Sequence, residues 1–202
     1  VGLRQNLAEI MDQIELREVD ITDLGRLRPA LEGVDFVLHQ AALRSVPRSV
    51  DNPLPSNYVN VVGTLNLLVA ARDAGVKRFV YGGSSSAYGD TPTLPKHESM
   101  PPNPISPYAV SKLAGEMYAR VFTRTYGLPT VCLRYFNLFG PRQDPTSPYS
   151  AVLSIFIAAL LRGQRPTVFG DGEQSRDFTY VDNAVEANLL ACSSPAAVGE
   201  VI

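Results

Sequence analysis

Tyr108 and Lys112 are the residues whose types and spacing most directly suggest chemistry. They lie four positions apart, directly after Ser106-Pro107, which is typical of a helix start with a hydroxyl cap and a proline at the first helical position. Side chains four residues apart project from one helix face. A tyrosine accepts a proton at neutral pH only if its pKa falls by about 3 units from about 10, and neighbouring cations favour that fall. The spacing alone fits an exposed surface pair equally well.

Three serines add a possible partner for the tyrosine. The apolar run 78–81 predicts a buried strand, and Gly82-Gly83-Ser84-Ser85-Ser86 follows it directly. In α/β proteins the ligand lies in the crevice at the carboxyl ends of the strands. From this place Ser84 could hydrogen-bond both a phenol and a substrate hydroxyl. A plain Ser/Gly turn is the alternative interpretation.

Strands and helices that could position these residues alternate along the chain. Apolar runs predict strands over 36–39, 78–81 and 129–135, and helical periodicity predicts helices over 60–74 and 108–126. This order predicts an α/β fold, a Rossmann-like doubly wound parallel sheet with helices on both faces.

The pattern changes after residue 137. A Gly/Pro-rich loop at 140–148 leads to an apolar helix at 151–161. Residues 167–169 and 176–178 predict two short strands around a Gly-Asp-Gly turn. A last helix is expected at about 182–191, and 199–202 reads as the first residues of another strand.

Composition excludes several classes of protein. The 202 residues are 45% hydrophobic and 19% charged with a net charge of -2, so the chain can bury a core. It has no basic block, which argues against a nucleic-acid partner. The apolar run 151–161 is about half the length that a membrane span needs, and no signal peptide is visible, so we expect a cytoplasmic protein without a membrane partner.

Histidine and cysteine give no catalytic or metal signal. Cys132 and Cys192 match no metal or redox motif, and both are expected to be buried small hydrophobes in a reducing compartment. His39 ends a buried strand and His97 lies in a Pro-rich loop, so neither receives a catalytic role. No metal site is predicted.

Together, several motifs resemble those of the extended short-chain dehydrogenase/reductase family. They are Ser84-Ser85-Ser86-Ala87-Tyr88-Gly89-Asp90, Ser106-Pro107-Tyr108-Ala109-Val110-Ser111-Lys112, Arg134-Tyr135-Phe136-Asn137 and Arg176-Asp177-Phe178. Within that family the chain is similar to nucleotide-sugar 4-epimerases, over essentially its whole length. The resemblance implies an NAD-binding Rossmann core at 1–135. It also implies part of a small nucleotide-sugar-binding region at 136–202, with the helix at about 182–191 packing back on the core.

The resemblance implies roles for the central residues. Tyr108 would be the acid/base, Lys112 would hold the nicotinamide ribose and lower the Tyr108 pKa, and Ser84 would orient the sugar 4-hydroxyl. Asn60 fits either a cofactor contact or a polar helix cap. The residues expected to bind the cofactor NAD are Asp20, Ile21, Gln40, Ala41, Ala42, Arg44, Asn60, Tyr108, Lys112 and Phe136.

The resemblance also implies a UDP-sugar site. Arg176 would clamp the diphosphate, and Phe169 would lie beside the uracil. The alternatives are a surface charge for Arg176, a core position for Phe169 and an ordinary helix face for Ala151 and Val152. The residues expected to bind substrate are Ser45, Ser84, Ser85, Ser86, Asn137, Gln143, Ala151, Val152, Thr167, Phe169 and Arg176.

Several reactions fit a family of this kind. The related 4,6-dehydratases carry Asp-Glu where this chain has Ser85-Ser86, and serine cannot eliminate water, so C4 epimerisation through a 4-keto sugar is expected. Small residues near the sugar, with Gln143, favour UDP-N-acetylglucosamine; UDP-glucuronate and UDP-glucose are the alternatives. A non-catalytic NAD-binding regulator or scaffold is a different class, but such proteins usually lose the Ser84, Tyr108 and Lys112 set.

Part of the cofactor site is expected to lie outside these residues. A dinucleotide-binding sheet normally opens with a strand, a Gly-rich turn and a helix, and no such unit precedes the segment 16–21. We therefore expect an N-terminal first βα unit to be missing, and weak NAD binding and little turnover from the 202 residues alone. The acidic residue that separates NAD from NADP is also not found. Relatives commonly form homodimers by pairing the helices that start at Asn60 and Tyr108 into a bundle.

Overall fold

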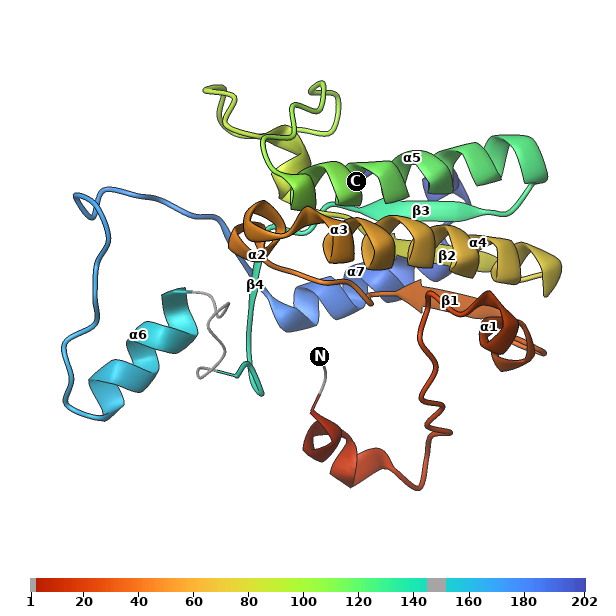
Figure 1. The fold of residues 1–202 in the computed structure, drawn as a ribbon, viewed down its shortest axis with the longest axis horizontal. Helices are drawn as coiled ribbons and strands as arrows, with labels where there is room; N and C mark the ends of the chain where they lie inside the picture. Colours follow the sequence, from red (N-terminus) through yellow and green to blue (C-terminus); the bar gives the residue numbers. More distant parts are fainter. Residues whose placement is uncertain (1–2, 145–151) are drawn as a thin grey trace.

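The computed structural model describes residues 3–144 and 152–202 of the chain, which alternates helices with short strands (Figure 1). The α-helices are α1 (Leu24–Ala30), α2 (Val46–Asp51), α3 (Pro53–Asn57), α4 (Thr64–Asp73), α5 (Pro107–Tyr126), α6 (Val152–Leu161) and α7 (Val181–Ser193). The strands are β1 (Phe36–His39), β2 (Arg78–Gly82), β3 (Thr130–Leu133), β4 (Asn137–Phe139) and β5 (Phe178–Tyr180). Short 3-10 turns cover Arg4–Ile10, Ser85–Tyr88 and Pro195–Ala197, and a π-helical segment covers Tyr58–Gly63.

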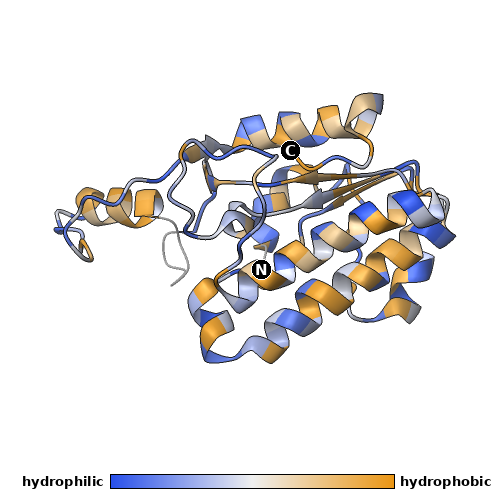
Figure 2. Ribbon diagram, turned by 90° about the horizontal axis from the view of Figure 1, so that it is seen from above, coloured by the Kyte–Doolittle hydropathy of each residue, from blue (hydrophilic) through white to orange (hydrophobic). Residues whose placement is uncertain are grey.

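A parallel sheet in the order β1-β2-β3 forms the centre of the fold. Along β2, Phe79 and Tyr81 pack with α4 and α5, whereas Val80 faces Ala191 of α7. Alternate side chains point to opposite faces of a strand, so this burial shows that helices cover both faces of the sheet (Figure 2). The expected doubly wound α/β architecture is confirmed.

The C-terminal residues and the two cysteines were also assigned from the sequence. Residues 199–202, expected as the first residues of a strand, run beside β3 and form one isolated parallel bridge, between Cys132 and Val201. Of the two cysteines expected in the core, Cys132 is buried but Cys192 is only half-buried, because α7 turns it partly outward. No helix in the described ranges is both long and apolar enough to cross a membrane.

Helix α5 carries the two residues from which the chemistry was inferred. The Ser106 hydroxyl accepts a hydrogen bond from the Ala109 N–H at 3.1 Å, and Pro107 occupies the first turn. Gly127, with a φ of 69°, adopts the left-handed conformation that ends the helix. These local signals explain why the predicted bounds agree with the structure to within one residue.

The helix predicted over 60–74 is longer than expected. Helical structure begins at Pro53, passes through the π segment 58–63 and continues as α4 to residue 73. A β-carbon added at Gly63 would lie 2.7 Å from the Ile21 side chain, so the glycine allows residue 21 to pack directly on this helix. The prediction began too late because a π segment breaks the 3.6-residue periodicity on which it relied.

The hairpin predicted around the turn 170–172 is wrong. Residues 167–169 form no strand, and β5 instead pairs in parallel with β4 (Asn137 opposite Phe178). Gly170 and Gly172 have φ values of 76° and 85°, and the Gln174 amide closes the turn on the Phe169 carbonyl at 2.8 Å. The turn was recognised, but the pairing partner lies about 40 residues away and leaves no local signal.

Candidate active site

The Tyr108 phenol lies beside the expected partner Ser84. The Ser84 hydroxyl lies close enough to the phenol to lower its pKa as a hydrogen-bond donor. Burial raises the pKa of Tyr108, whereas the Ser84 hydrogen bond and the positive charge of Arg44 lower it. Because burial is the largest of these effects, the chain alone holds the phenol in its neutral form. Arg44 is the cation that lowers the pKa of Tyr108 in the chain alone, and the effect expected of Lys112 stays a prediction.

Ser84 is positioned by the end of β2 and by the chain after β3. Its hydroxyl caps the 3-10 turn 85–88 by accepting the Ser86 N–H at 3.2 Å, and the Ser85 N–H donates to the Tyr135 carbonyl at 2.9 Å. A β-carbon at Gly83 would lie 3.0 Å from the Leu133 carbonyl oxygen. Glycine is therefore needed where β2 and β3 approach each other just before the serines.

Lys112 is a buried ammonium that lies over an aromatic ring. Its Nζ is 4.5 Å from the centre of the Tyr81 ring, and the Tyr81 hydroxyl donates to the Lys112 carbonyl at 3.1 Å. Burial lowers the pKa of Lys112 to about 8. Within residues 3–144 and 152–202 the ammonium has no acidic partner and makes no hydrogen bond. A buried cation with free donors fits a ligand that brings hydroxyl or phosphate oxygens.

Asn60 holds the loop that follows β1. Its amide oxygen accepts the Leu43 N–H at 2.7 Å, and its amide nitrogen donates to the Leu43 carbonyl at 3.1 Å and to the Ser111 hydroxyl at 3.0 Å. The side chain is buried, and all of these partners belong to the protein. Asn60 lies inside the π segment 58–63, so the helix cap considered from the sequence is wrong, and its cofactor contact stays a prediction.

The other residues expected at the cofactor contact different parts of the protein. The Asp20 carboxylate accepts both the N–H and the hydroxyl of Thr22 at 2.8 Å, which lowers the pKa of Asp20. Gln40 turns toward α7 and donates to Tyr135 and Asn188. Ile21 packs on Gly63, Phe136 stacks on Tyr88 at 6.4 Å, and Ala41 and Ala42 lie in the loop after β1.

A buried ion pair supports the 3-10 turn at 85–88 (the serine turn). The sequence did not predict this ion pair. Arg134, directly after β3, forms two hydrogen bonds of 2.8 Å with Glu116, one turn beyond Lys112 on α5. The two side chains are each 5% exposed, and the Arg134 guanidinium lies 4.6 Å from the centre of the Tyr88 ring. An acidic residue on the buried face of a predicted helix was the signal that could have revealed the pair.

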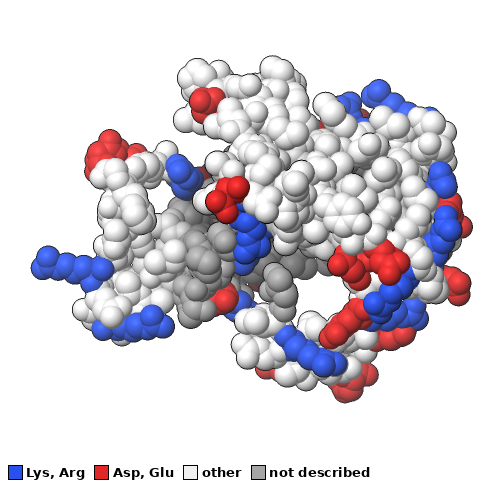
Figure 3. All heavy atoms as spheres, in the orientation of Figure 1, with Lys and Arg blue, Asp and Glu red and all other residues white. Residues whose placement is uncertain are grey.

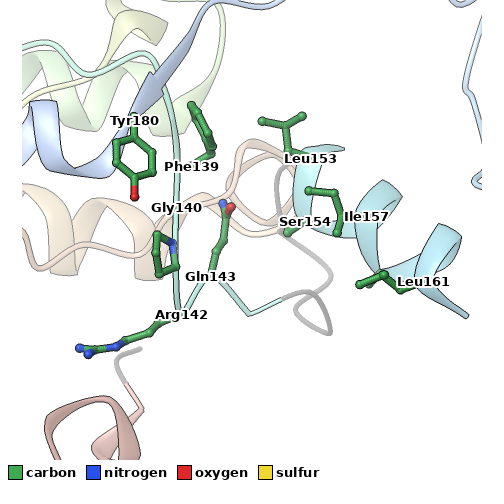
Figure 4. Close-up of a pocket in the computed structure, with 11 residues that line it drawn as sticks. Phe139, Gly140, Arg142, Gln143, Leu153, Ser154, Ile157, Leu161 and Tyr180 are labelled. Atoms are coloured by element: carbon green, nitrogen blue, oxygen red, sulfur yellow. The ribbon is translucent and has the colours of Figure 1, made fainter. Parts of the chain in front are cut away.

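The expected substrate residues fall into two groups. Asn137 donates to the Asp177 carbonyl at 3.1 Å and so joins β4 to β5. Gln143 lines a pocket of about 500 Å³ between this strand pair and α6, with Phe139, Leu153 and Tyr180 (Figure 4). Arg142 points out of that pocket and donates to the Asn6 carbonyl at 3.1 Å.

The second group is mostly exposed where the structure describes it. Thr167 and Arg176 are exposed, Phe169 is 83% exposed, and Arg176 contacts only the neighbouring Ser175 carbonyl among its described hydrogen-bond partners. Val152 is exposed at the start of α6, and Ala151 lies outside the described residues. Ser45 caps α2 by accepting the Arg48 N–H at 3.1 Å. The core position considered for Phe169 is wrong, and its nucleotide contact stays a prediction.

Known proteins are similar to this chain in both sequence and fold. A UDP-glucose 4-epimerase of Mycolicibacterium smegmatis is 41% identical over 98% of the chain. The structure of a UDP-N-acetylglucosamine 4-epimerase from Methanobrevibacter ruminantium M1, in complex with UDP-N-acetylmuramic acid, superposes on 96% of the chain with a TM-score of 0.92 and 43% identity. A dTDP-glucose 4,6-dehydratase from Streptomyces venezuelae, solved with NAD bound, covers 99% with a TM-score of 0.89 and 35% identity.

These matches cover nearly all of this chain but only part of each relative. The chain spans 64%, 63% and 61% of the length of those three proteins, in the same order. Residues 3–202 match the model of the NAD dependent epimerase/dehydratase family, which is nearly the whole chain. The protein therefore belongs to this NAD-dependent family of epimerases and dehydratases, in the short-chain dehydrogenase/reductase superfamily.

Proposed function

We propose that the whole protein epimerises C4 of a UDP-sugar, with Tyr108 as acid/base and Ser84 as the residue that orients the reacting hydroxyl. The observation that carries this proposal is the Ser84 hydroxyl beside the Tyr108 phenol at the carboxyl end of β2, close enough to lower the pKa of that phenol. Ser85 and Ser86 favour epimerisation over dehydration, since neither side chain can serve as the acid or base that eliminates water.

The residues at the carboxyl edge of the sheet fit NAD. Lys112 offers a buried ammonium without an acidic partner in the described part of the chain, and Arg44 offers an exposed guanidinium in the loop after β1. We infer that Lys112 holds the nicotinamide ribose, and that Asp20 and Ile21 lie beside the adenine. When bound, NAD supplies the hydride chemistry at the sugar C4.

The chain's own residues handle the proton and the geometry. The Tyr108 Oη takes the proton from the 4-hydroxyl. It later returns the proton to the 4-oxygen of the sugar, whose C4 then has the opposite configuration. Burial raises the pKa of Tyr108 even with Arg44 and Ser84 beside it, so proton transfer requires further positive charge near the phenol, which the nicotinamide ring of bound NAD would add. Ser84 shares its hydroxyl between the phenol and the substrate oxygen, and so keeps the two within hydrogen-bond reach.

The sugar that we propose is UDP-N-acetylglucosamine. Serines at 84–86 leave space near the reacting carbon, and the Gln143 amide lies in the pocket between β4 and α6, where it can donate to an acetamido carbonyl. The similar proteins include both UDP-glucose and UDP-N-acetylglucosamine 4-epimerases. UDP-glucose is therefore the second candidate.

We expect kcat/KM of the whole protein to be at least about 10-fold higher with UDP-N-acetylglucosamine than with UDP-glucose, because one hydrogen bond to the acetamido group contributes about 0.5–1.5 kcal/mol and its apolar contacts add to that. Initial rates with both sugars, followed by chromatography of the UDP-hexoses, measure the ratio. In a Gln143→Leu variant the ratio should fall toward one. A wild-type preference for UDP-glucose would assign the protein to the second candidate.

We further propose that the whole protein is a homodimer that pairs the helices around α5. Val110, Met117 and Val121 lie exposed on one side of α5, and Leu54 and Tyr58 are exposed on the neighbouring helical segment. Figure 3 shows a broad area without charged side chains over these helices. Soluble monomers rarely expose continuous apolar surface of this kind, so a second copy covering it is the simplest arrangement.

A further inference from the structure

The loop between β1 and α2 is held in place at both of its ends. At its start, the Asn60 amide bonds both backbone groups of Leu43, with distances of 2.7 and 3.1 Å. At its end, Ser49 of α2 is completely buried, and its hydroxyl accepts the backbone N–H of Tyr108 at 3.0 Å. The segment from 43 to 49 thus connects one side of the cofactor edge to the start of α5.

The middle of this loop has an unfavourable backbone conformation. Ser45 has a φ of 126°, in a region that residues with a β-carbon rarely adopt. Such a conformation persists only where the surrounding structure imposes it, and it is found most often at functional sites. Here the two clamps at Leu43 and Ser49 impose it, and they also fix Arg44, whose charge acts on the Tyr108 phenol.

Ser49 has a specific relation to the backbone of Tyr108. The first N–H groups of a helix have no partner within the helix. The Ser106 hydroxyl accepts the Ala109 N–H, and the Ser49 hydroxyl accepts the Tyr108 N–H. The Ser49 hydroxyl also donates its own proton to the Val46 carbonyl at 2.8 Å. The Tyr108 carbonyl in turn accepts the Ser111 hydroxyl at 2.8 Å. Buried serines therefore hold both backbone groups of this residue.

We propose that Ser49 is a positioning residue for Tyr108, which sets the phenol against Ser84 and Arg44 through the backbone. The inference rests on the proposed function, because it assumes that Tyr108 is the acid/base. Since Ser49 ends the loop that carries Arg44, a single segment fixes both the reacting phenol and the cation facing it. Ser49 is too deeply buried to touch a ligand, so its effect must appear in kcat rather than in substrate binding.

The test compares Ser49→Ala with Ser56→Ala in the whole protein loaded with NAD. Ser56 is a matched control, because it is equally buried in the adjacent α3, and its hydroxyl has no hydrogen-bond partner in the described part of the chain. For Ser49→Ala we expect kcat to fall about 10-fold with KM for the UDP-sugar within about twofold of wild type, since small misplacements of a reacting group are costly. Ser56→Ala should keep the wild-type kcat.

The pH profile separates positioning from packing. The charged and titratable groups around the phenol are Arg44 from the loop, Tyr81 from β2 and Lys112 from α5 itself. If the phenol moves away from Ser84 and Arg44, its pKa rises, and the acidic limb of the kcat profile should shift upward by about 0.5 units in Ser49→Ala only. Ser49→Cys, which keeps a weak donor and acceptor, should lie between wild type and Ser49→Ala.

Three outcomes would overturn the proposal: a wild-type kcat and pH profile for Ser49→Ala, an equal loss in Ser56→Ala, or a shift in KM alone. Failure of the proposed function is recognised separately, by full epimerisation in Tyr108→Phe or by no epimerisation in wild type. In either case ¹³C-tyrosine NMR still decides the positioning role. The Tyr108 resonance, assigned by its loss in Tyr108→Phe, must titrate at higher pH in Ser49→Ala than in wild type, and an unchanged titration would refute the role.

Discussion

Tyr108→Phe in the whole protein is expected to lower kcat for epimerisation by about 10²–10⁴-fold, the usual contribution of a positioned proton donor and acceptor. The change removes one oxygen and keeps the ring, so the packing of α5 on β2 should persist. NAD and UDP-sugar binding should change by less than about threefold, because Lys112 and the substrate region are untouched. Initial rates and calorimetric titrations on the same preparation measure both quantities.

Tyr126→Phe is the matched control for that experiment. Tyr126 lies at the far end of the same helix, where it is exposed and packs on Phe122, and it should keep the wild-type rate. If Tyr108→Phe also kept most of the activity, Tyr108 would not be the acid/base. If wild type bound NAD without any turnover, the alternative of an NAD-binding regulator or scaffold would gain support.

The second large effect concerns stability. Glu116→Gln should lower the free energy of unfolding by about 3–5 kcal/mol, because it leaves the buried Arg134 guanidinium without its counter-charge. The pair joins α5 to the end of β3 and supports Tyr88 in the serine turn, so the Ser84 hydroxyl should also become less ordered. Urea unfolding of the whole protein, followed by circular dichroism, gives the change in free energy.

An exposed ion pair provides the control. Lys77 and Asp35 lie 3.0 Å apart with both side chains more than half exposed, so Asp35→Asn should cost less than about 1 kcal/mol. Replacing both buried partners, as Glu116→Leu with Arg134→Leu, should recover part of the loss, since neither charge is then left unpaired. A Glu116→Gln variant as stable as wild type would show that the Arg134 charge is solvated by other means.

Features with local causes could be predicted from the sequence. The bounds of α5 follow from Ser106, Pro107 and Gly127, and the buried strands follow from short apolar runs. The place of Ser84 also follows from one rule, that α/β proteins bind their ligands at the carboxyl ends of the strands. Each of these depends on residues close together in the chain or on a general property of the fold.

Features that depend on distant partners could not be predicted. The pairing of β4 with β5 joins segments about 40 residues apart, and the Glu116–Arg134 ion pair depends on how a helix packs over a strand. No sequence pattern indicated the role of Ser49, whose hydroxyl accepts the Tyr108 N–H of another helix. The partners of Asn60 could not be predicted for the same reason, because Leu43 and Ser111 come from two other elements.

The distribution of charge around Tyr108 also changes the expected chemistry. The resemblance implies that Lys112 lowers the Tyr108 pKa, whereas in the chain alone Lys112 lies over Tyr81 and Arg44 is the cation that lowers the pKa of the phenol. Lys112 makes no hydrogen bond in the described part of the chain, so its donors are available to a ligand. In the proposed mechanism, Lys112 would therefore bind the ribose while Arg44 adds positive charge near the phenol.

The most direct test of the central claim is the fate of deuterium placed at C4 of UDP-N-acetylglucosamine. The whole protein with NAD should convert it to UDP-N-acetylgalactosamine, with the label retained at the inverted C4, because hydride leaves and returns within one closed site. Proton and deuterium NMR of the product measure both the configuration and the label. Loss of the label to solvent, or a product without inversion at C4, would contradict the account.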